Sequence, residues 1–174
     1  MGFLANQLFA FIKLLNSETG TNQIAAGIAA GFILGMTPFF SLQSILVFFL
    51  VFIFRIQIGA VFIATFFFAF PAFLLDPVFH RVGVMILELP SLQGLFTSLY
   101  NLPIIPFTRF YNTIVMGSGV LAFALSPLVF YVSRIFVVKY RAVVVERFKQ
   151  SGIFKALKMS AIYKWYYKYN QYYG

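Results

Sequence analysis

"GIAAGFILGMTPFFSLQS", Gly27 to Ser44, sets three glycines four residues apart and then interrupts an apolar run with Thr-Pro. Pro38 lacks an N–H and disfavours helix at the residue before it, so we expect a helix to end at Met36 and the chain to turn. A helix over Ile24 to Met36 would be about 20 Å long, short of the roughly 30 Å hydrocarbon core of a bilayer. The stretch predicts a short helical hairpin over 24–54, either re-entrant or crossing and returning.

The composition places the chain in a membrane. It is 61% hydrophobic and 10% charged over 174 residues, which leaves too little polar surface for a water-soluble globule. Two further charge-free runs, Ile56 to Leu75 and Phe110 to Ser133, are 20 and 24 residues long, enough to span a bilayer. We therefore expect an all-α integral membrane protein with transmembrane helices at 56–75 and 110–133 and an outer loop at 76–109.

Both ends of the single membrane domain predict amphipathic helices at the membrane surface. Residues 1–18 repeat apolar side chains at helical spacing, and the tail 134–174 carries nine of the thirteen Lys and Arg with one acid, Glu146. Basic and aromatic residues beside a span favour anionic lipid headgroups over nucleic acid. The residues expected at this lipid interface are Lys155, Lys158, Lys164, Trp165, Tyr166, Tyr167 and Lys168.

The charges also predict the topology. Lys and Arg near span ends are retained in the cytoplasm, so the tail should be cytoplasmic. If 24–54 is a hairpin, the N-terminus, Arg55 and the tail all lie inside, and the loop 76–109 lies outside. The expected location is the bacterial inner membrane, crossed several times, with both termini cytoplasmic.

The opening stretch holds two candidate sites. Gly27, Gly31 and Gly35 form one ridge of a helix, and such ridges are the usual packing surface between membrane helices. The break that follows collects polar residues, and broken helices in transporters build substrate sites in this way. Packing is the simpler interpretation, and a polar pocket is the alternative. The members of this polar turn are Thr37, Pro38, Ser41, Gln43 and Ser44.

A second polar cluster is expected at the outer ends of the spans, formed by Asp76, His80, Arg81, Arg109 and Asn112. Asp76 and His80 are four residues apart and would share one helical face. Asp before Pro is also a common helix start, which favours a capping or interfacial role over a proton relay. An ion pair between Asp76 and Arg109 would join the two span ends.

Four stretches resemble a known family. "IAAGIAAGFILGMTPFFSLQSIL", "FLLDPVFHRVG", "RFYNTIVMGS" and "YKWYY" are similar to the bacterial membrane family called domain of unknown function 2062, and to its short-chain subgroup. The chain departs from the family pattern at Ser41, where glycine is expected, and at Asp76, where the family often has asparagine. The resemblance implies a small inner-membrane protein that accompanies a much larger envelope protein.

The remaining chemistry argues against catalysis. The sequence has no cysteine, one histidine and four acids, too few ligands for a zinc or calcium site, and no cofactor is expected. No nucleophile, base and orienting group stand at catalytic spacing. We therefore expect a non-enzymatic subunit that anchors or supports a larger envelope protein, in a role connected with lipid transport. The alternative is an oligomeric carrier or flippase that uses the hairpin turn at Pro38.

Overall fold

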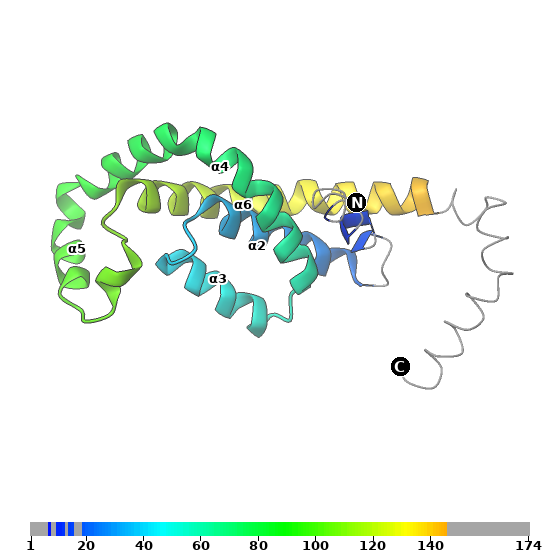
Figure 1. The fold of residues 1–174 in the computed structure, drawn as a ribbon, viewed down its shortest axis with the longest axis horizontal. Coiled ribbons are helices and arrows are strands. Elements are labelled where there is room, and N and C mark those ends of the chain that lie inside the picture. Colours follow the sequence, from blue (N-terminus) through cyan, green and yellow to red (C-terminus); the bar gives the residue numbers. More distant parts are fainter. Residues whose placement is uncertain (1–6, 8–9, 13, 16–18, 146–174) are drawn as a thin grey trace, which may run out of the picture. The chain divides into compact units, whose positions relative to one another are not determined.

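The computed structural model describes residues 7, 10–12, 14–15 and 19–145, and all regular structure in this part of the chain is helical, as the sequence predicted (Figure 1). The chain forms two compact units, Met1–Val137 and Val138–Gly174. Of the second unit, the structure describes only the end of α6 and the π-helical turn η3. The elements from residue 19 onward are α2 (Thr21–Met36), α3 (Leu42–Ile53), α4 (Ile58–Leu87), the 3-10 helix η1 (Pro90–Leu92), α5 (Gln93–Tyr100), the 3-10 helix η2 (Ile105–Thr108), α6 (Thr113–Tyr140) and η3 (Arg141–Val145).

Local chemistry sets both sides of the hairpin turn. α2 ends at Met36 because Thr37 is extended before Pro38, with φ of −104° and ψ of 149°. α3 begins after Ser41, whose side-chain oxygen accepts a hydrogen bond from the Ser44 N–H at 3.2 Å and so caps the helix. The chain therefore turns where proline interrupts the apolar run.

The return from α3 to α4 is a left-handed helix cap. Arg55 has φ of 50°, and its N–H donates to the Phe52 carbonyl at 3.2 Å, while the Ile56 N–H donates to the Val51 carbonyl at 3.0 Å. This pair of hydrogen bonds is the Schellman arrangement, which usually has glycine at the left-handed position. Because Arg55 is exposed, the turn presents a cation at this end of the hairpin.

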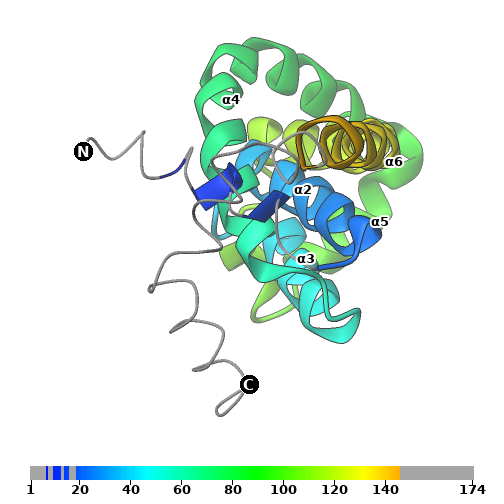
Figure 2. The same cartoon turned by 90° about the vertical axis from the view of Figure 1, so that its right-hand side faces the viewer.

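α4 is 30 residues long and passes through two prolines. Pro71 and Pro77 each lack the N–H that would close a helical hydrogen bond, and α4 forms an arch in both views (Figures 1 and 2). The expectation that Asp76 starts or caps a helix before Pro77 is wrong, because the helix continues through this pair to Leu87. The expected outer loop 76–109 thus begins with about three turns of α4.

The glycine ridge of α2 lies directly against α4. A Cβ on Gly31 would lie only 2.5 Å from the Val61 carbonyl oxygen, so the two backbones approach without a side chain between them. Each step of four residues along α2 matches a step of four along α4, so the two helices run parallel in constant register. The facing pairs are Gly27 with Ala60, Gly31 with Ala64 and Gly35 with Phe68.

A second close crossing joins α4 to α6 through one glycine from each helix. A Cβ on Gly83 would overlap the Thr113 carbonyl, and a Cβ on Gly117 would overlap the Phe79 carbonyl. The α6 numbers fall as the α4 numbers rise, so these helices are antiparallel. The sequence analysis did not identify this crossing.

The apolar core lies where α2 meets its neighbouring helices. Phe32 of α2 and Phe68 of α4 pack edge to face with ring centroids 5.0 Å apart. Val47 and Val51 of α3 are both buried beside them. The buried members of this core are Ala30, Phe32, Ile33, Leu34, Met36, Val47, Val51, Val61, Phe79 and Ala122.

Two helices of the described part are long and apolar enough to cross a membrane, over Ile58–Leu87 and Thr113–Val143. Within an apolar 18-residue window of each helix, only 22% and 17% of the residues are buried in the chain, so both helices keep many exposed or half-buried apolar side chains. Figure 2 looks along α6 and shows α4 arched beside it. The outward side chains include Phe62, Phe70, Phe73, Leu74, Leu125, Leu128, Tyr131 and Val132.

Candidate functional site at the hairpin turn

Three hydroxyl side chains close the hairpin turn from within. Thr37, Ser41 and Ser44 are buried, with exposed fractions of 5%, 0% and 0%. The Ser44 hydroxyl lies 3.1 Å from the Thr37 hydroxyl and 3.0 Å from the Ser41 hydroxyl, and it donates to the Pro38 carbonyl at 3.0 Å. The Thr37 hydroxyl donates to the Ile33 carbonyl at 2.8 Å. All three hydroxyls are therefore satisfied inside the protein.

Gln43 differs from its neighbours at the turn. Its amide reaches from α3 to α6, where it occupies the space that a Cβ on Gly119 would need. Nε2 lies 3.5 Å from the Val115 carbonyl, at the limit of a hydrogen bond, and Oε1 is buried without a partner among the described residues. A buried amide oxygen without a donor costs about 1–3 kcal/mol. Gln43 therefore keeps an unused acceptor between the hairpin and α6.

Two members of the expected outer cluster fix the start of α6. His80 Nδ1 lies 2.7 Å from Thr113 Oγ1, which ties α4 to the first residue of α6. Asn112 caps α6, because its Oδ1 accepts from the Ile114 N–H at 2.9 Å and from the Val115 N–H at 3.2 Å. His80 therefore joins α4 to α6, and Asn112 stabilises the first turn of α6.

The other three members are not brought together by ion pairs. Asp76 is half-buried on α4, while Arg81 and Arg109 are exposed. Among the residues that the structure describes, Asp76 forms no ion pair with Arg109, contrary to the sequence expectation. The reason is that α4 does not end near Asp76, so this residue does not mark a span end. Arg109 instead borders a pocket beside the hairpin turn.

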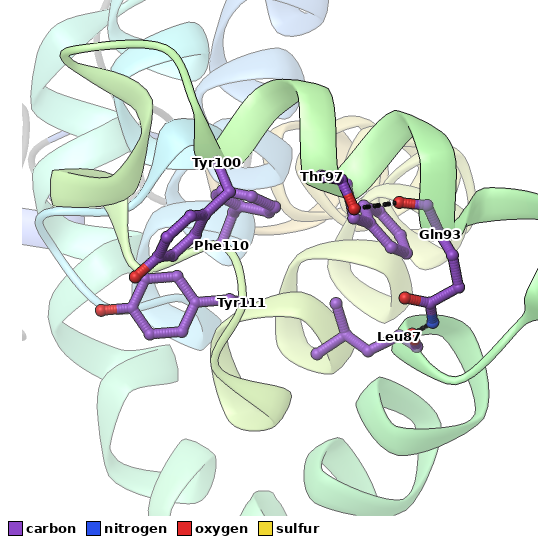
Figure 3. Close-up of a pocket in the computed structure, with 7 residues that line it drawn as sticks. Leu87, Gln93, Thr97, Tyr100, Phe110 and Tyr111 are labelled. Atoms are coloured by element: carbon purple, nitrogen blue, oxygen red, sulfur yellow. Dashed lines mark hydrogen bonds between the residues drawn. The ribbon is translucent and has the colours of Figure 1, made fainter.

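An aromatic pocket of about 310 Å³ lies between α5 and the segment that leads into α6 (Figure 3). Tyr100 and Tyr111 meet edge to face with ring centroids 5.5 Å apart. Gln93 Nε2 donates to the Leu87 carbonyl at 2.6 Å, and the Thr97 hydroxyl donates to the Gln93 carbonyl at 2.8 Å. The sequence analysis missed this pocket, although aromatic residues on both sides of a proline-rich loop were a signal for it.

The expected lipid-interface residues of the tail, from Lys155 to Lys168, lie outside the described residues. In the part of the chain that is described, no three His, Asp or Glu side chains gather in a way that could hold a metal ion. The predicted polar residues that the structure describes thus lie mainly at the hairpin turn and at the start of α6.

Fold and site define a class: a small helical protein with two helices long and apolar enough to cross a membrane and a glycine-packed hairpin against the first of them. Residues 8–144 match the family described as "Uncharacterized protein conserved in bacteria (DUF2062)", and the chain belongs to this family. The resemblance inferred from the sequence is therefore confirmed.

One relative illustrates the family. The chain is 29% identical over 158 residues to a protein of Treponema pallidum (strain Nichols) that is described as uncharacterized. The match covers 90% of this chain and 97% of that protein, so the two correspond over nearly their whole lengths. No solved structure matches the chain significantly.

Proposed function

We propose that this chain is a non-enzymatic subunit of the bacterial inner membrane that anchors or supports a larger cell-envelope protein, in a complex that transports lipid. The observation that carries this proposal is the outward apolar surface of α4 and α6, of which little is buried within the chain. In a bilayer such faces contact lipid or the spans of a partner. The family resemblance, which implies a larger envelope partner, favours the partner for at least one face.

The polar groups support a structural role for the hairpin. The hydroxyls of Thr37, Ser41 and Ser44 bond to one another and to the main chain, so they offer little to a passing solute. His80 and Thr113 form a base–hydroxyl pair, but no carboxylate orients the imidazole among the described residues. This arrangement favours tying two helices together over catalysis.

We further infer that the hairpin enters from the cytoplasmic side and turns near the outer ends of the spans. α2 has 16 residues and is about 24 Å long, less than the roughly 30 Å core. At its tip, Gln43 reaches Gly119, within two turns of the start of α6. Arg55, at the other end of the hairpin, would then lie at the cytoplasmic ends of α3 and α4, where Lys and Arg are retained.

Helices at the membrane surface complete the proposed arrangement: one at residues 1–18, one in the outer loop and one in the C-terminal tail. α5 exposes Leu95 and Tyr100, a combination suited to the interface between lipid and water. Near the N-terminus, Phe11 packs on Phe67 of α4 with ring centroids 6.4 Å apart, which would hold that segment against the first span.

Thiol labelling in intact cells tests the topology, since the natural chain has no cysteine. A single cysteine at Ser91, which is exposed beyond α4, should react with an impermeant reagent. A cysteine at Gln57, just before α4, should react only after the cells are opened. Labelling at Gln57 from outside would contradict the hairpin and the cytoplasmic termini together.

Affinity purification from native membranes in mild detergent tests the subunit role. We expect a larger envelope protein to copurify at a fixed ratio. Tryptophan at Leu128 of α6 or at Phe73 of α4, 61% and 78% exposed, leaves the core intact and should release the partner from the face that it covers. A chain that purifies with no other protein, as a monomer or as an oligomer of itself, would contradict the proposal.

A carrier or flippase is the second candidate function, and the observation that favours it is the Oε1 atom of Gln43. Gln43 Oε1, at the tip of the hairpin, is buried and has no hydrogen-bond partner among the described residues, and a polar pathway would need such acceptor groups. Gln43 would then face a solute in an oligomer rather than simply fill the space beside Gly119. The Gln43→Leu variant described below separates the two candidates.

A further inference from the structure

A second pocket, of about 350 Å³, lies where the hairpin turn meets the segment before α6. Its walls are apolar except for one cation. All three of its aromatic rings are exposed: Phe39 by 65%, Phe40 by 79% and Phe107 by 80%. The residues that line it are Pro38, Phe39, Phe40, Phe107, Arg109 and Val115.

The cation of this pocket stands on a hydrogen-bonded, left-handed turn of the backbone. Arg109 has φ of 54°, the left-handed region that residues with side chains rarely adopt. Its N–H donates to the Pro106 carbonyl at 3.0 Å, and its carbonyl accepts from the Asn112 N–H at 2.9 Å. In the described part of the chain, no hydrogen bond or ion pair engages the guanidinium. Its donors are therefore open to a ligand.

We propose that this pocket binds an anionic phospholipid, with the headgroup phosphate on Arg109 and the start of the acyl chains on Phe39, Phe40 and Phe107. A guanidinium matches the oxygens of a phosphate in paired hydrogen bonds. The exposed rings require an apolar partner beside that charge, and a phospholipid carries both groups in one molecule. Inorganic phosphate or an acidic peptide would satisfy the cation and leave the rings uncovered.

The proposal rests on the membrane placement proposed above. In that placement Arg109 stands just before the first turn of α6, at the level of the headgroups, and the hairpin turn lies on the acyl side of it. An anionic phospholipid is a lipid that a subunit of a lipid-transport complex would contact. Its binding would also explain why Phe39 and Phe40 are exposed at the turn, which the hydrogen bonds among the buried hydroxyls do not explain.

Lipid retention by the full chain tests the proposal. The purified protein is placed in nanodiscs of phosphatidylcholine with phosphatidylglycerol and then analysed for bound lipid by native mass spectrometry. The wild-type chain should retain phosphatidylglycerol in preference to phosphatidylcholine. Arg109→Gln should lower that preference about fivefold, the size of one cation at an anionic surface. Phe107→Ala should lower retention of both lipids, because it removes the apolar wall.

Two arginines serve as matched controls. Arg55 is exposed and left-handed like Arg109, with φ of 50°, and Arg81 is exposed on α4; neither lines this pocket. Arg55→Gln and Arg81→Gln should retain lipid as the wild type does. Equal loss in all three arginine variants would show a general charge effect and overturn the proposal, as would displacement of the lipid by inorganic phosphate alone.

Membrane insertion is scored separately by alkaline extraction of membranes that carry each variant. An Arg109→Gln chain that stays inserted and keeps its full lipid preference overturns the pocket alone and leaves the subunit role standing. A wild-type chain that is extracted from the membrane overturns the placement on which both proposals depend.

Discussion

The hairpin turn over residues 37–41 and the turn over residues 105–109, here called the Arg109 turn, both contain proline followed by phenylalanine. The polar side chains of the first turn bond to one another, whereas the cation of the second turn is exposed. In the hairpin turn the polar side chains face inward and bond to one another, and Phe39 and Phe40 face outward. In the second turn Thr108 is buried and donates to the Ile105 carbonyl at 2.6 Å, while Arg109 is exposed. The same proline–phenylalanine sequence thus forms a turn with internally bonded hydroxyls in one place and a turn with an exposed cation in the other.

The difference shows that a polar residue near a membrane break is no sign of function by itself. The Thr37 and Ser44 hydroxyls bond to each other and to the Ile33 and Pro38 carbonyls, so both are satisfied within the turn, as buried polar groups must be. Arg109 satisfies no group of the described chain, and its left-handed backbone holds it in an aromatic pocket. The partner of each polar group is therefore the better guide to its role.

The largest effect should come from a substitution that separates α2 from α4, since this packing holds the hairpin. Gly31→Leu would force α2 away from α4, because even a Cβ would lie 2.5 Å from the Val61 carbonyl oxygen and from Ala64 Cβ. Overpacking of this kind costs about 3 kcal/mol. We expect the variant to yield little folded protein, measured by accumulation in membranes and by size-exclusion profile.

Gly94→Leu is the matched control for this variant. Apart from the neighbouring backbone of α5 itself, no heavy atom of the described residues lies within 4 Å of a Cβ at Gly94, so the larger side chain has room on exposed α5. This protein should accumulate normally apart from a small change due to helix propensity. A Gly31→Leu chain that is as stable as the control would show that α2 does not pack on α4 as described.

A smaller effect is expected from opening the closed turn. Ser44→Ala removes the hydroxyl that links Thr37, Ser41 and the Pro38 carbonyl. Side-chain hydrogen bonds in membrane proteins contribute about 0.6 kcal/mol each, so the loss of three should lower the free energy of unfolding in detergent by about 2 kcal/mol. Ser98→Ala, which loses one exposed bond within α5, should change stability by much less. Equal effects of the two substitutions would mean that the buried network adds no stability.

The smallest effect on stability should come from Gln43. Leucine there removes an amide whose Oε1 has no partner within the described part of the chain, so folding should be unchanged or slightly favoured. A subunit should keep its copurifying partner and its activity in cells. If Gln43→Leu assembles normally yet abolishes activity, the polar-pathway candidate gains and the anchoring role fails.

The sequence carried the local features of this fold. Thr-Pro after an apolar helix predicted the turn after Met36, because proline acts on the residue beside it. The long charge-free runs predicted two helices long enough to span, and the structure has both. Their ends were predicted less well, because α4 continues through Pro71 and Pro77 to Leu87, although each proline lacks the N–H for one helical hydrogen bond.

The contacts between helices could not be predicted from local sequence patterns. Gly83 and Gly117 are far apart in the sequence, and they come together only because α4 and α6 cross there. Arg109 was expected opposite Asp76 because both seemed to end spans, whereas the fold carries it to the hairpin turn. Pairings of this kind depend on where helices cross, which no local pattern encodes.

Cross-linking tests most directly whether the two turns meet. Phe40 and Phe107 are 79% and 80% exposed and border the same pocket, and the chain has no cysteine of its own. With cysteine at both positions, a short bifunctional thiol reagent should join them in native membranes in nearly every molecule. Cysteines at Phe40 and Phe54, on either side of α3, should stay unlinked because the 12 residues of that helix, about 18 Å in length, separate them. If Phe40→Cys and Phe107→Cys each react singly but never cross-link, the hairpin turn does not reach the Arg109 turn and the account is wrong.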